Sequence, residues 1–172
     1  MSWLSLNVQE AIEKRRSIRK FKSQAQAITE EQLLILKKAI QLSPSASNMQ
    51  PYKFIVVTDE ELKKNLVKGG SLQGFISKAS VIFVGIGDPS RERWFKVDIG
   101  IAMEHLALQA MELGLGSCWI GAFDEEQVKA ILKIPPNLRI VALMPIGIAG
   151  QDPPARPRKS LEELFIDNYF ES

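Results

Sequence analysis

The chain has 172 residues, of which 45% are hydrophobic and 24% charged, and its net charge at pH 7 is only +2. These values are typical of one globular domain over residues 1–172, and they exclude a disordered chain. The single cysteine, Cys118, excludes an intramolecular disulfide. Neither a secretory signal nor an apolar run of the ~18 residues that span a membrane is evident, so we expect a cytoplasmic protein.

Capping signals and apolar spacing predict the helices. Asn7 with Glu10 predicts a first helix start, and Thr29 with Gln32 predicts a second. The second helix should end before Pro44, because a residue that precedes proline avoids the α region. Further helices are expected after Asp59, from about Glu92 to Leu113, after Asp124 and after Ser160.

Four apolar runs predict strands, at 53–58, 80–87, 116–121 and 139–149. The order of helices and strands along the chain by itself favours a parallel α/β arrangement. The periodicity of the side chains does not decide the matter, because they alternate in the same way in parallel and antiparallel strands.

A basic cluster in residues 14–22 places six cationic side chains within nine residues of a nearly neutral chain. One interpretation is a solvated helix end, where cations interact favourably with the helix dipole. The other is a phosphate site, since arginine forms charge-assisted, often bidentate hydrogen bonds to phosphate. A second basic group, at 156–159, follows a proline-rich stretch, and the two groups could hold one dianion between them. Nucleic acid is less favoured, because the cluster lacks aromatic platforms.

Other candidate sites are weaker. The G-x-G at 85–87 lacks the third glycine of a dinucleotide site, because position 90 is Ser90. His105 is the only histidine, so we expect a satisfied core side chain there, without catalytic or metal-binding work. Cys118 is expected to be a small buried hydrophobe. The chain thus has an anion site without evident acid–base groups, as in enzymes whose cofactor supplies the reactivity.

Four motifs occur in the order and spacing of the FMN-dependent nitroreductase family, which the chain resembles over roughly residues 8–165. They are "RRSIRKF" (15–21), "SPSASNMQPYKFIVV" (43–57), "GLGSCWIG" (114–121) and "RPRKSLEEL" (156–164). The resemblance implies an α+β nitroreductase fold, with a mixed, mainly antiparallel sheet of about four to five strands between helices. It also implies an intertwined homodimer with FMN at the subunit interface.

The resemblance further implies which residues contact FMN. Arg15 and Arg16 would serve its phosphate and ribityl end, with Arg158 completing the phosphate site, and Arg19 would meet the pyrimidine edge. Loop 44–48 would reach the flavin from the partner subunit, and residues 119–121 would approach the ring from another side. The full predicted set is Arg15, Arg16, Ser17, Arg19, Pro44, Ser45, Ala46, Ser47, Asn48, Trp119, Ile120, Gly121 and Arg158.

The implied activity is transfer of hydride or electrons from NADPH or NADH, through FMN, to a small oxidised acceptor such as a nitroaromatic or quinone. Kinetics would be ping-pong, with hydride accepted at flavin N5, no catalytic side chain, and Arg19 tuning the flavin. Neither nucleic acid nor membrane would be a partner. The terminal residues Phe165, Ile166, Tyr169 and Phe170 would pack on the partner subunit or on their own core. The alternative is a non-catalytic module that binds a phosphorylated ligand or nucleic acid through Arg15–Lys22.

Overall fold

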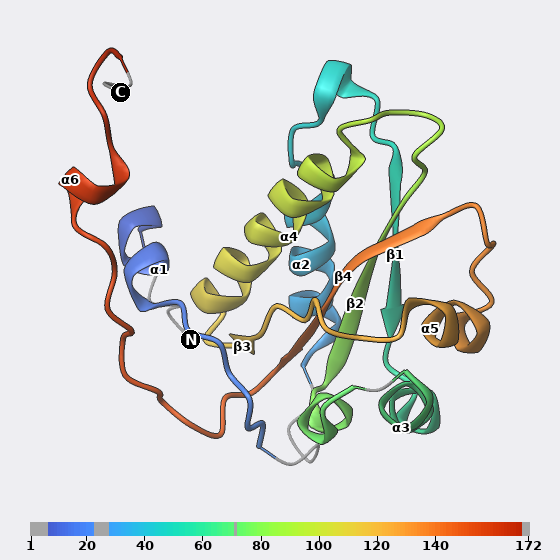
Figure 1. Cartoon of the computed structure of the whole chain (residues 1–172). Helices are drawn as coiled ribbons and strands as arrows, with labels where there is room; N and C mark the ends of the chain where they lie inside the picture. The colour runs from blue at the N-terminus through green and yellow to red at the C-terminus, as the bar shows by residue number, and fades with distance from the viewer. Residues whose placement is uncertain (1–6, 23–27, 71, 170–172) are drawn as a thin grey trace.

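The computed structural model describes residues 7–22, 28–70 and 72–169. Figure 1 shows the elements in space. The α-helices are α1 (Val8–Lys14), α2 (Glu30–Gln41), α3 (Glu60–Gly69), α4 (Phe95–Glu112), α5 (Glu125–Leu132) and α6 (Leu161–Leu164). The strands are β1 (Tyr52–Val57), β2 (Val81–Gly87), β3 (Gly116–Ser117) and β4 (Arg139–Gly147), and the short 3-10 helices are η2 (Ala46–Asn48) and η3 (Gly74–Lys78).

The helix starts follow the predicted capping signals. Asn7 caps α1 and Thr29 caps α2, each in a reciprocal capping box, as does Ser160 at α6. Asp59 and Asp124 accept a backbone N–H at the starts of α3 and α5. These side chains satisfy N–H groups that the first helical turn leaves without a partner, which explains why the starts could be predicted.

In the described part of the chain the strands form one four-stranded sheet in the order β1-β2-β4-β3. Every neighbouring pair in this sheet is antiparallel; Val84 of β2, for example, lies opposite Ile55 on one side and Leu143 on the other. The parallel arrangement that the element order favoured is therefore wrong. The mainly antiparallel sheet implied by the resemblance is confirmed, and an isolated parallel bridge between Ser17 and Ser117 makes the pairing mixed.

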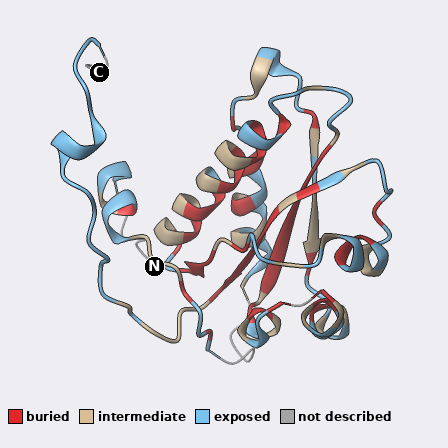
Figure 2. Ribbon diagram, viewed as in Figure 1, coloured by how far each residue is buried: buried red, intermediate tan, exposed pale blue. Residues whose placement is uncertain are grey.

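Helices cover both faces of the sheet (Figures 1 and 2). All seven residues of β2 are buried, and they alternate between two cores. Val81 and Phe83 pack with α2 and α4, whereas Ile82, Val84 and Ile86 pack with α3, η3 and α5. A strand that is buried on both faces reads as a continuous apolar run, as this one does in the sequence.

Helix α4 lies close against β2 because glycine occupies the strand positions that face it. A Cβ at Gly85 would lie 2.7 Å from Cγ2 of Ile99, and a Cβ at Gly87 would overlap the ring of Phe95. The small side chains thus set the distance between helix and sheet. The helix begins at Phe95, three residues later than predicted.

The C-terminal segment stands away from this body (Figure 1). Its large apolar side chains, Leu161, Leu164, Phe165, Ile166 and Tyr169, are between 56% and 82% exposed. Packing of the tail on its own core is therefore wrong for residues 161–169, and Phe170 lies outside the described residues. No helix within the described ranges has the length and apolar character needed to cross a membrane.

We predict that Gly87→Ala lowers the free energy of unfolding by about 1–3 kcal/mol, because the added methyl group forces Phe95 out of its packed position. Gly74→Ala is the matched control, since a Cβ there meets no atom within 4 Å. Its effect should stay within about 0.5 kcal/mol. Chemical denaturation measures both. Equal stabilities of the two variants would contradict the proposed close contact.

Candidate functional site

The basic segment, residues 15–22, is an extended stretch that joins the edge of the sheet through isolated bridges at Ser17 and Phe21. The N–H of Ile18 donates to Ser117 O at 2.9 Å, and the N–H of Lys22 donates to Ile148 O at 2.9 Å. Ile18 and Phe21 face inward and are buried, which leaves Arg19 and Lys20 exposed. The two apolar side chains of this segment thus face the core, and the two cationic side chains between them face solvent.

Close packing fixes this segment against β3. A Cβ at Gly116 would lie 2.7 Å from Cγ1 of Ile18, so glycine is needed where the two backbones approach. The chain that leaves β4 is held as well, because the N–H of Gly150 donates to Lys20 O at 2.8 Å. The chain after Gly150 therefore starts beside the basic segment, although Gly150 and Lys20 are 130 positions apart in the sequence.

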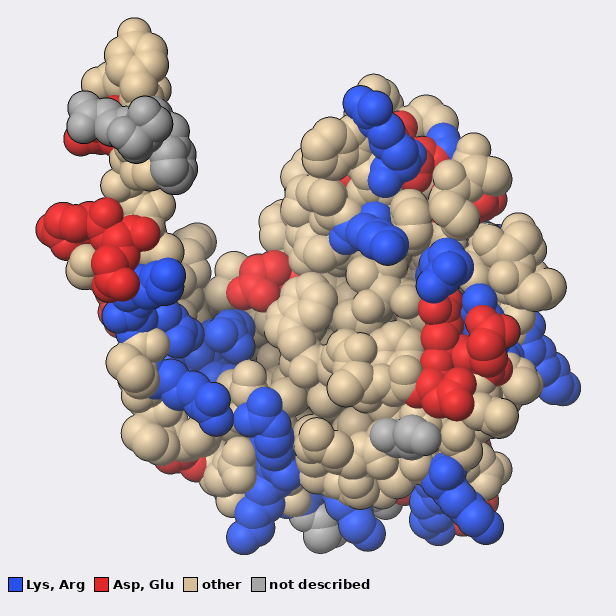
Figure 3. Space-filling view, viewed as in Figure 1, with Lys and Arg blue, Asp and Glu red and all other residues tan. Residues whose placement is uncertain are grey.

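The two basic groups meet at one cavity of about 380 Å³. Figure 3 shows lysine and arginine side chains gathered between the C-terminal segment and the body. Arg15 and Arg158, from the two ends of the chain, line the same cavity, as a dianion held between the two basic groups requires. The residues that line it are Ile12, Glu13, Arg15, Arg16, Ser17, Arg19, Gln151, Pro153, Pro154, Ala155, Arg156 and Arg158. We call it the arginine cavity.

Arg16 bears on both interpretations of the basic cluster, the helix end and the phosphate site. Its Nη1 donates to Glu13 O at 2.6 Å and to Arg15 O at 2.9 Å, so the guanidinium caps carbonyl groups at the end of α1. The same side chain lines the arginine cavity. The helix-end interpretation therefore holds for Arg16, and the anion-site interpretation of the cluster stays a prediction.

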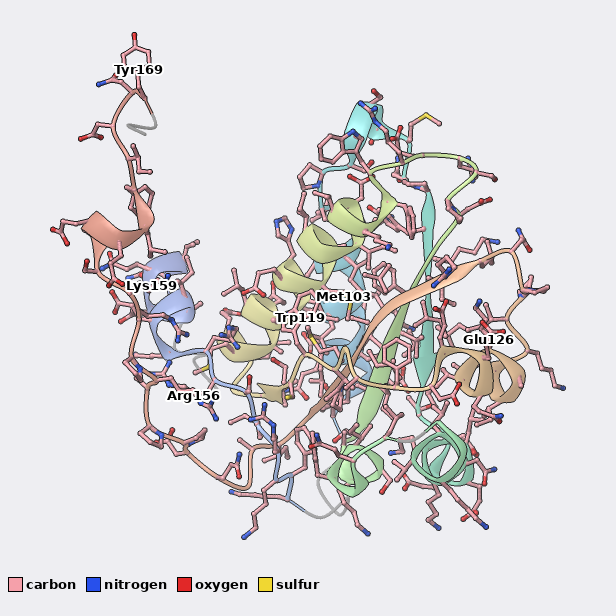
Figure 4. The ribbon with its side chains drawn as sticks, viewed as in Figure 1. Met103, Trp119, Glu126, Arg156, Lys159 and Tyr169 are labelled. Atoms are coloured by element: carbon pink, nitrogen blue, oxygen red, sulfur yellow. The ribbon has the colours of Figure 1, made fainter. Side chains whose placement is uncertain are left out.

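Arg15 is linked to Trp119 through a residue that the sequence analysis missed. Glu104 of α4 places Oε1 3.7 Å from Arg15 Nε, and its Oε2 accepts a hydrogen bond from Trp119 Nε1 at 3.1 Å. Figure 4 labels Trp119, which lies beside α4. Glu104 sits in the middle of a predicted helix, and no motif around it distinguishes it from an ordinary surface glutamate.

The other residues of the predicted 119–121 segment differ in their surroundings. Ile120 is buried and exchanges two backbone hydrogen bonds with Leu143, so it extends the sheet beyond β3. Gly121 is exposed, and a Cβ there would meet no atom of the chain within 4 Å. The packing within this chain therefore does not require glycine at position 121, and the space beside it is open.

The predicted loop 44–48 lies at the start of α4, and none of its residues lines the arginine cavity. Pro44, Ser47 and Asn48 are exposed, whereas Ser45 and Ala46 are half-buried. Within one chain the structure therefore does not bring this loop to the arginines. Its predicted approach from the partner subunit stays a prediction.

The backbone of this loop is strained and anchored. Ser47, Asn48 and Gln50 have φ values of 49°, 54° and 45°, in the left-handed region that non-glycine residues rarely adopt. The N–H of Ala46 donates to Asp98 Oδ1 at 3.0 Å. Asp98 is 2% exposed, and its Oδ2 is buried without a hydrogen-bond partner among the described residues. Strain of this kind persists only where neighbouring contacts impose it.

The prediction for His105 was wrong, whereas that for Cys118 is confirmed. His105 is exposed and lines a groove between α1, α2 and α4, because the buried face of α4 passes through Ala102, Met103 and Leu106 instead. Cys118 is 1% exposed. Burial raises the pKa of the Cys118 thiol against the opposing effect of the nearby Arg19 charge, so the thiol stays protonated at neutral pH.

Comparison with known proteins agrees with this architecture. The chain is similar to an FMN-dependent nitroreductase from Clostridium difficile R20291, with a TM-score of 0.83 and 30% identity, covering 92% of this chain and 98% of that one. A relative from Archaeoglobus fulgidus, whose name describes an NADH dehydrogenase/NAD(P)H nitroreductase, is 34% identical over 141 residues, 77% of this chain and 80% of its own. An NADPH-flavin oxidoreductase from Vibrio harveyi is 28% identical, over 96% of this chain and 75% of its own length.

The sequence signature of the nitroreductase family matches residues 12–70 and 67–148. These ranges include the basic segment, the strained loop and the 114–121 motif. The residues after β4 that line the arginine cavity lie outside them. The predicted family is therefore confirmed: the chain belongs to the nitroreductase family.

Proposed function

We propose that this protein uses FMN to pass hydride or electrons from NAD(P)H to a small oxidised acceptor, such as a nitroaromatic or a quinone. Family membership and the names of the relatives support the enzyme class and both predicted cofactors. The observation that carries the proposal is the convergence of Arg15 and Arg158 on one cavity. Location in the cytoplasm stays a prediction.

The arginine cavity suits the phosphate end of FMN. A phosphomonoester carries about −1.5 to −2 charges at neutral pH and offers three strong acceptor oxygens. Five arginines among the described residues line the cavity, against the single acidic residue Glu13. The hydroxyl of Ser17 adds a neutral donor, and the prolines at 153 and 154 stiffen the wall opposite the basic segment. The donor set therefore fits a phosphorylated cofactor.

When bound, FMN supplies the hydride and electron transfer between donor and acceptor. The side chains hold and tune it: we assign Arg15, Arg16 and Arg158 to the phosphate end and Arg19 to the pyrimidine edge. The positive charge of Arg19 would favour the reduced, more negatively charged cofactor and so raise its potential. Donor and acceptor would then use one site in turn, which gives ping-pong kinetics.

We also propose a homodimer that completes this site. Loop 44–48 lies away from the arginine cavity of its own chain, so a second copy has to bring it to the flavin if the predicted contacts are correct. The apolar side chains of residues 161–169 lack a place on their own body. A groove of about 580 Å³ lies between α1, α2 and α4 and includes the exposed Val8 and Leu42. On a second copy, this groove would receive the apolar side chains of residues 161–169. Exposed apolar surface of this kind marks an interaction site.

We predict that the purified protein is yellow and that NADPH or NADH bleaches it. We also predict that Arg158→Ala weakens FMN binding about ten- to a hundredfold. A hydrogen bond to a charged group contributes about 1.5–3 kcal/mol. Lys159→Ala is the matched control, because Lys159 is the adjacent cation and does not line the cavity. Fluorescence titration of FMN measures both. A colourless protein that FMN does not titrate would favour the module that binds other phosphorylated ligands.

We predict that Arg19→Ala retains FMN but has a lower flavin midpoint potential and slower reduction by NAD(P)H, because a positive charge beside the reduced cofactor is lost. Spectroelectrochemistry measures the potential, and stopped-flow absorbance measures the rate. An unchanged potential would exclude the assigned role of Arg19. Lys20→Ala is the control, since Lys20 is the next exposed cation and does not line the cavity.

We predict that replacing both Leu164 and Phe165 with aspartate turns a dimer into monomers, because charged side chains cannot replace apolar ones in a buried contact without a large desolvation cost. Glu162→Gln, on the same short helix, should leave the dimer intact. Analytical ultracentrifugation gives the mass of each variant. If the wild type sediments as a monomer at micromolar concentration, the dimer proposal is wrong.

A further inference from the structure

Glu104 lies on α4 between two segments of the predicted site. Its Oε1 pairs with Arg15 of the basic segment at 3.7 Å, and its Oε2 accepts the indole N–H of Trp119, after β3, at 3.1 Å. The three residues are at least 15 positions apart from one another in the sequence. One carboxylate thus links the wall of the arginine cavity to the segment that runs toward Gly121.

We propose that Glu104 is a positioning residue for cofactor binding, which holds Arg15 at the arginine cavity and couples it to Trp119. The proposal rests on the proposed function for its consequence, because it assigns the cavity to the phosphate end of FMN. The contacts of Glu104 with Arg15 and Trp119 exist in the protein without a ligand, so they can be measured in the FMN-free protein.

Arg15 needs such a partner because of its neighbours. Arg16, Arg19, Arg156 and Arg158 line the same cavity, and like charges repel one another across it. A guanidinium that is free to move would turn toward solvent and away from these charges. The Arg15 side chain is only 22% exposed, so water screens its charge only in part. The nearby Glu104 carboxylate offsets part of the repulsion and keeps the side chain in place.

The geometry of the pair leaves Arg15 able to bind an anion. Glu104 approaches Nε, the donor nearest the backbone. The terminal Nη1 and Nη2 groups of a guanidinium carry four further N–H donors, which a phosphate could accept. Glu104 therefore orients the side chain without occupying the donors that an anion would use.

Trp119 depends on the other oxygen of the same carboxylate. The indole is half-buried, and its N–H can only donate, so removal of Glu104 leaves it without this acceptor. A buried donor without an acceptor is costly, and the ring would turn to find another one. We therefore expect the positions of Arg15 and Trp119 to change together when Glu104 is removed.

Glu104→Ala and Glu104→Gln separate the two contacts. In FMN-free, ¹⁵N-labelled protein, alanine should shift both the Trp119 Nε1–H and the Arg15 Nε–H signals. Glutamine keeps an acceptor for the indole but loses the charge, so it should shift mainly the arginine signal. In FMN titrations, alanine should raise the Kd about tenfold and glutamine by less. Glutamine has nearly the size of glutamate, and it carries the test if the alanine variant does not fold.

Two further variants test the route of the effect. If Glu104 acts through Arg15, the double variant Glu104→Ala with Arg15→Ala should bind FMN no more weakly than Arg15→Ala alone. Glu126→Ala is the matched control, since Glu126 is a glutamate on α5 that pairs with Lys129 away from the cavity (Figure 4). It should leave the Kd and both signals unchanged.

The outcomes distinguish this proposal from the proposed function. Unchanged signals in both Glu104 variants, tighter or equal FMN binding, or additive effects of the Glu104 and Arg15 substitutions would each overturn the positioning role. If wild-type protein does not bind FMN, the proposed function fails. The positioning role is then decided by the two signals and by titration with inorganic phosphate, which should bind Glu104→Ala more weakly than wild type.

Discussion

The backbone pairing of residues 17–22 with the ends of β3 and β4 is the constraint on which the site depends. The hydrogen bonds from Ile18 to Ser117 and from Lys22 to Ile148 fix an extended segment whose exposed side chains are cationic. The same pairing places the chain after Gly150 beside it, and Arg156 and Arg158 follow within a few residues. A cavity built from both ends of the chain needs β3 and the end of β4 to be in place, so the site and the fold are coupled.

The arginine cavity is also a concentration of charge that the fold has to tolerate. Glu104 offsets part of it at Arg15, and the carbonyl groups at the end of α1 accept hydrogen bonds from Arg16. Arg19, Arg156 and Arg158 are exposed and retain water around much of their charge. An anion that binds the native state and not the unfolded chain would offset the remaining repulsion, and the free energy of unfolding would rise with the logarithm of the anion concentration relative to its Kd.

Features that short-range rules determine could be predicted from the sequence. Caps such as Asn7 and Thr29 were correct because their hydrogen bonds join residues only three positions apart. Strand direction was not accessible, because alternation is the same in both arrangements, and the resemblance alone supplied it. The wrong expectation for His105 and the omission of Glu104 have one cause: both depend on which side of α4 faces the sheet, the basic segment or solvent. Apolar residues around much of that helix leave its orientation open.

The strained loop lies at the other end of α4, next to its first turn. Ser47, Asn48 and Gln50 each hold a left-handed backbone that costs on the order of 1 kcal/mol or more, and the buried carboxylate of Asp98 anchors the turn. Such a cost is difficult to explain in a loop that only connects α2 to β1, since a glycine at any of these positions would remove strain. It is explained if the loop presents a fixed surface to a ligand. The arginines of its own chain do not share a cavity with it, which agrees with the proposed contact from a second copy.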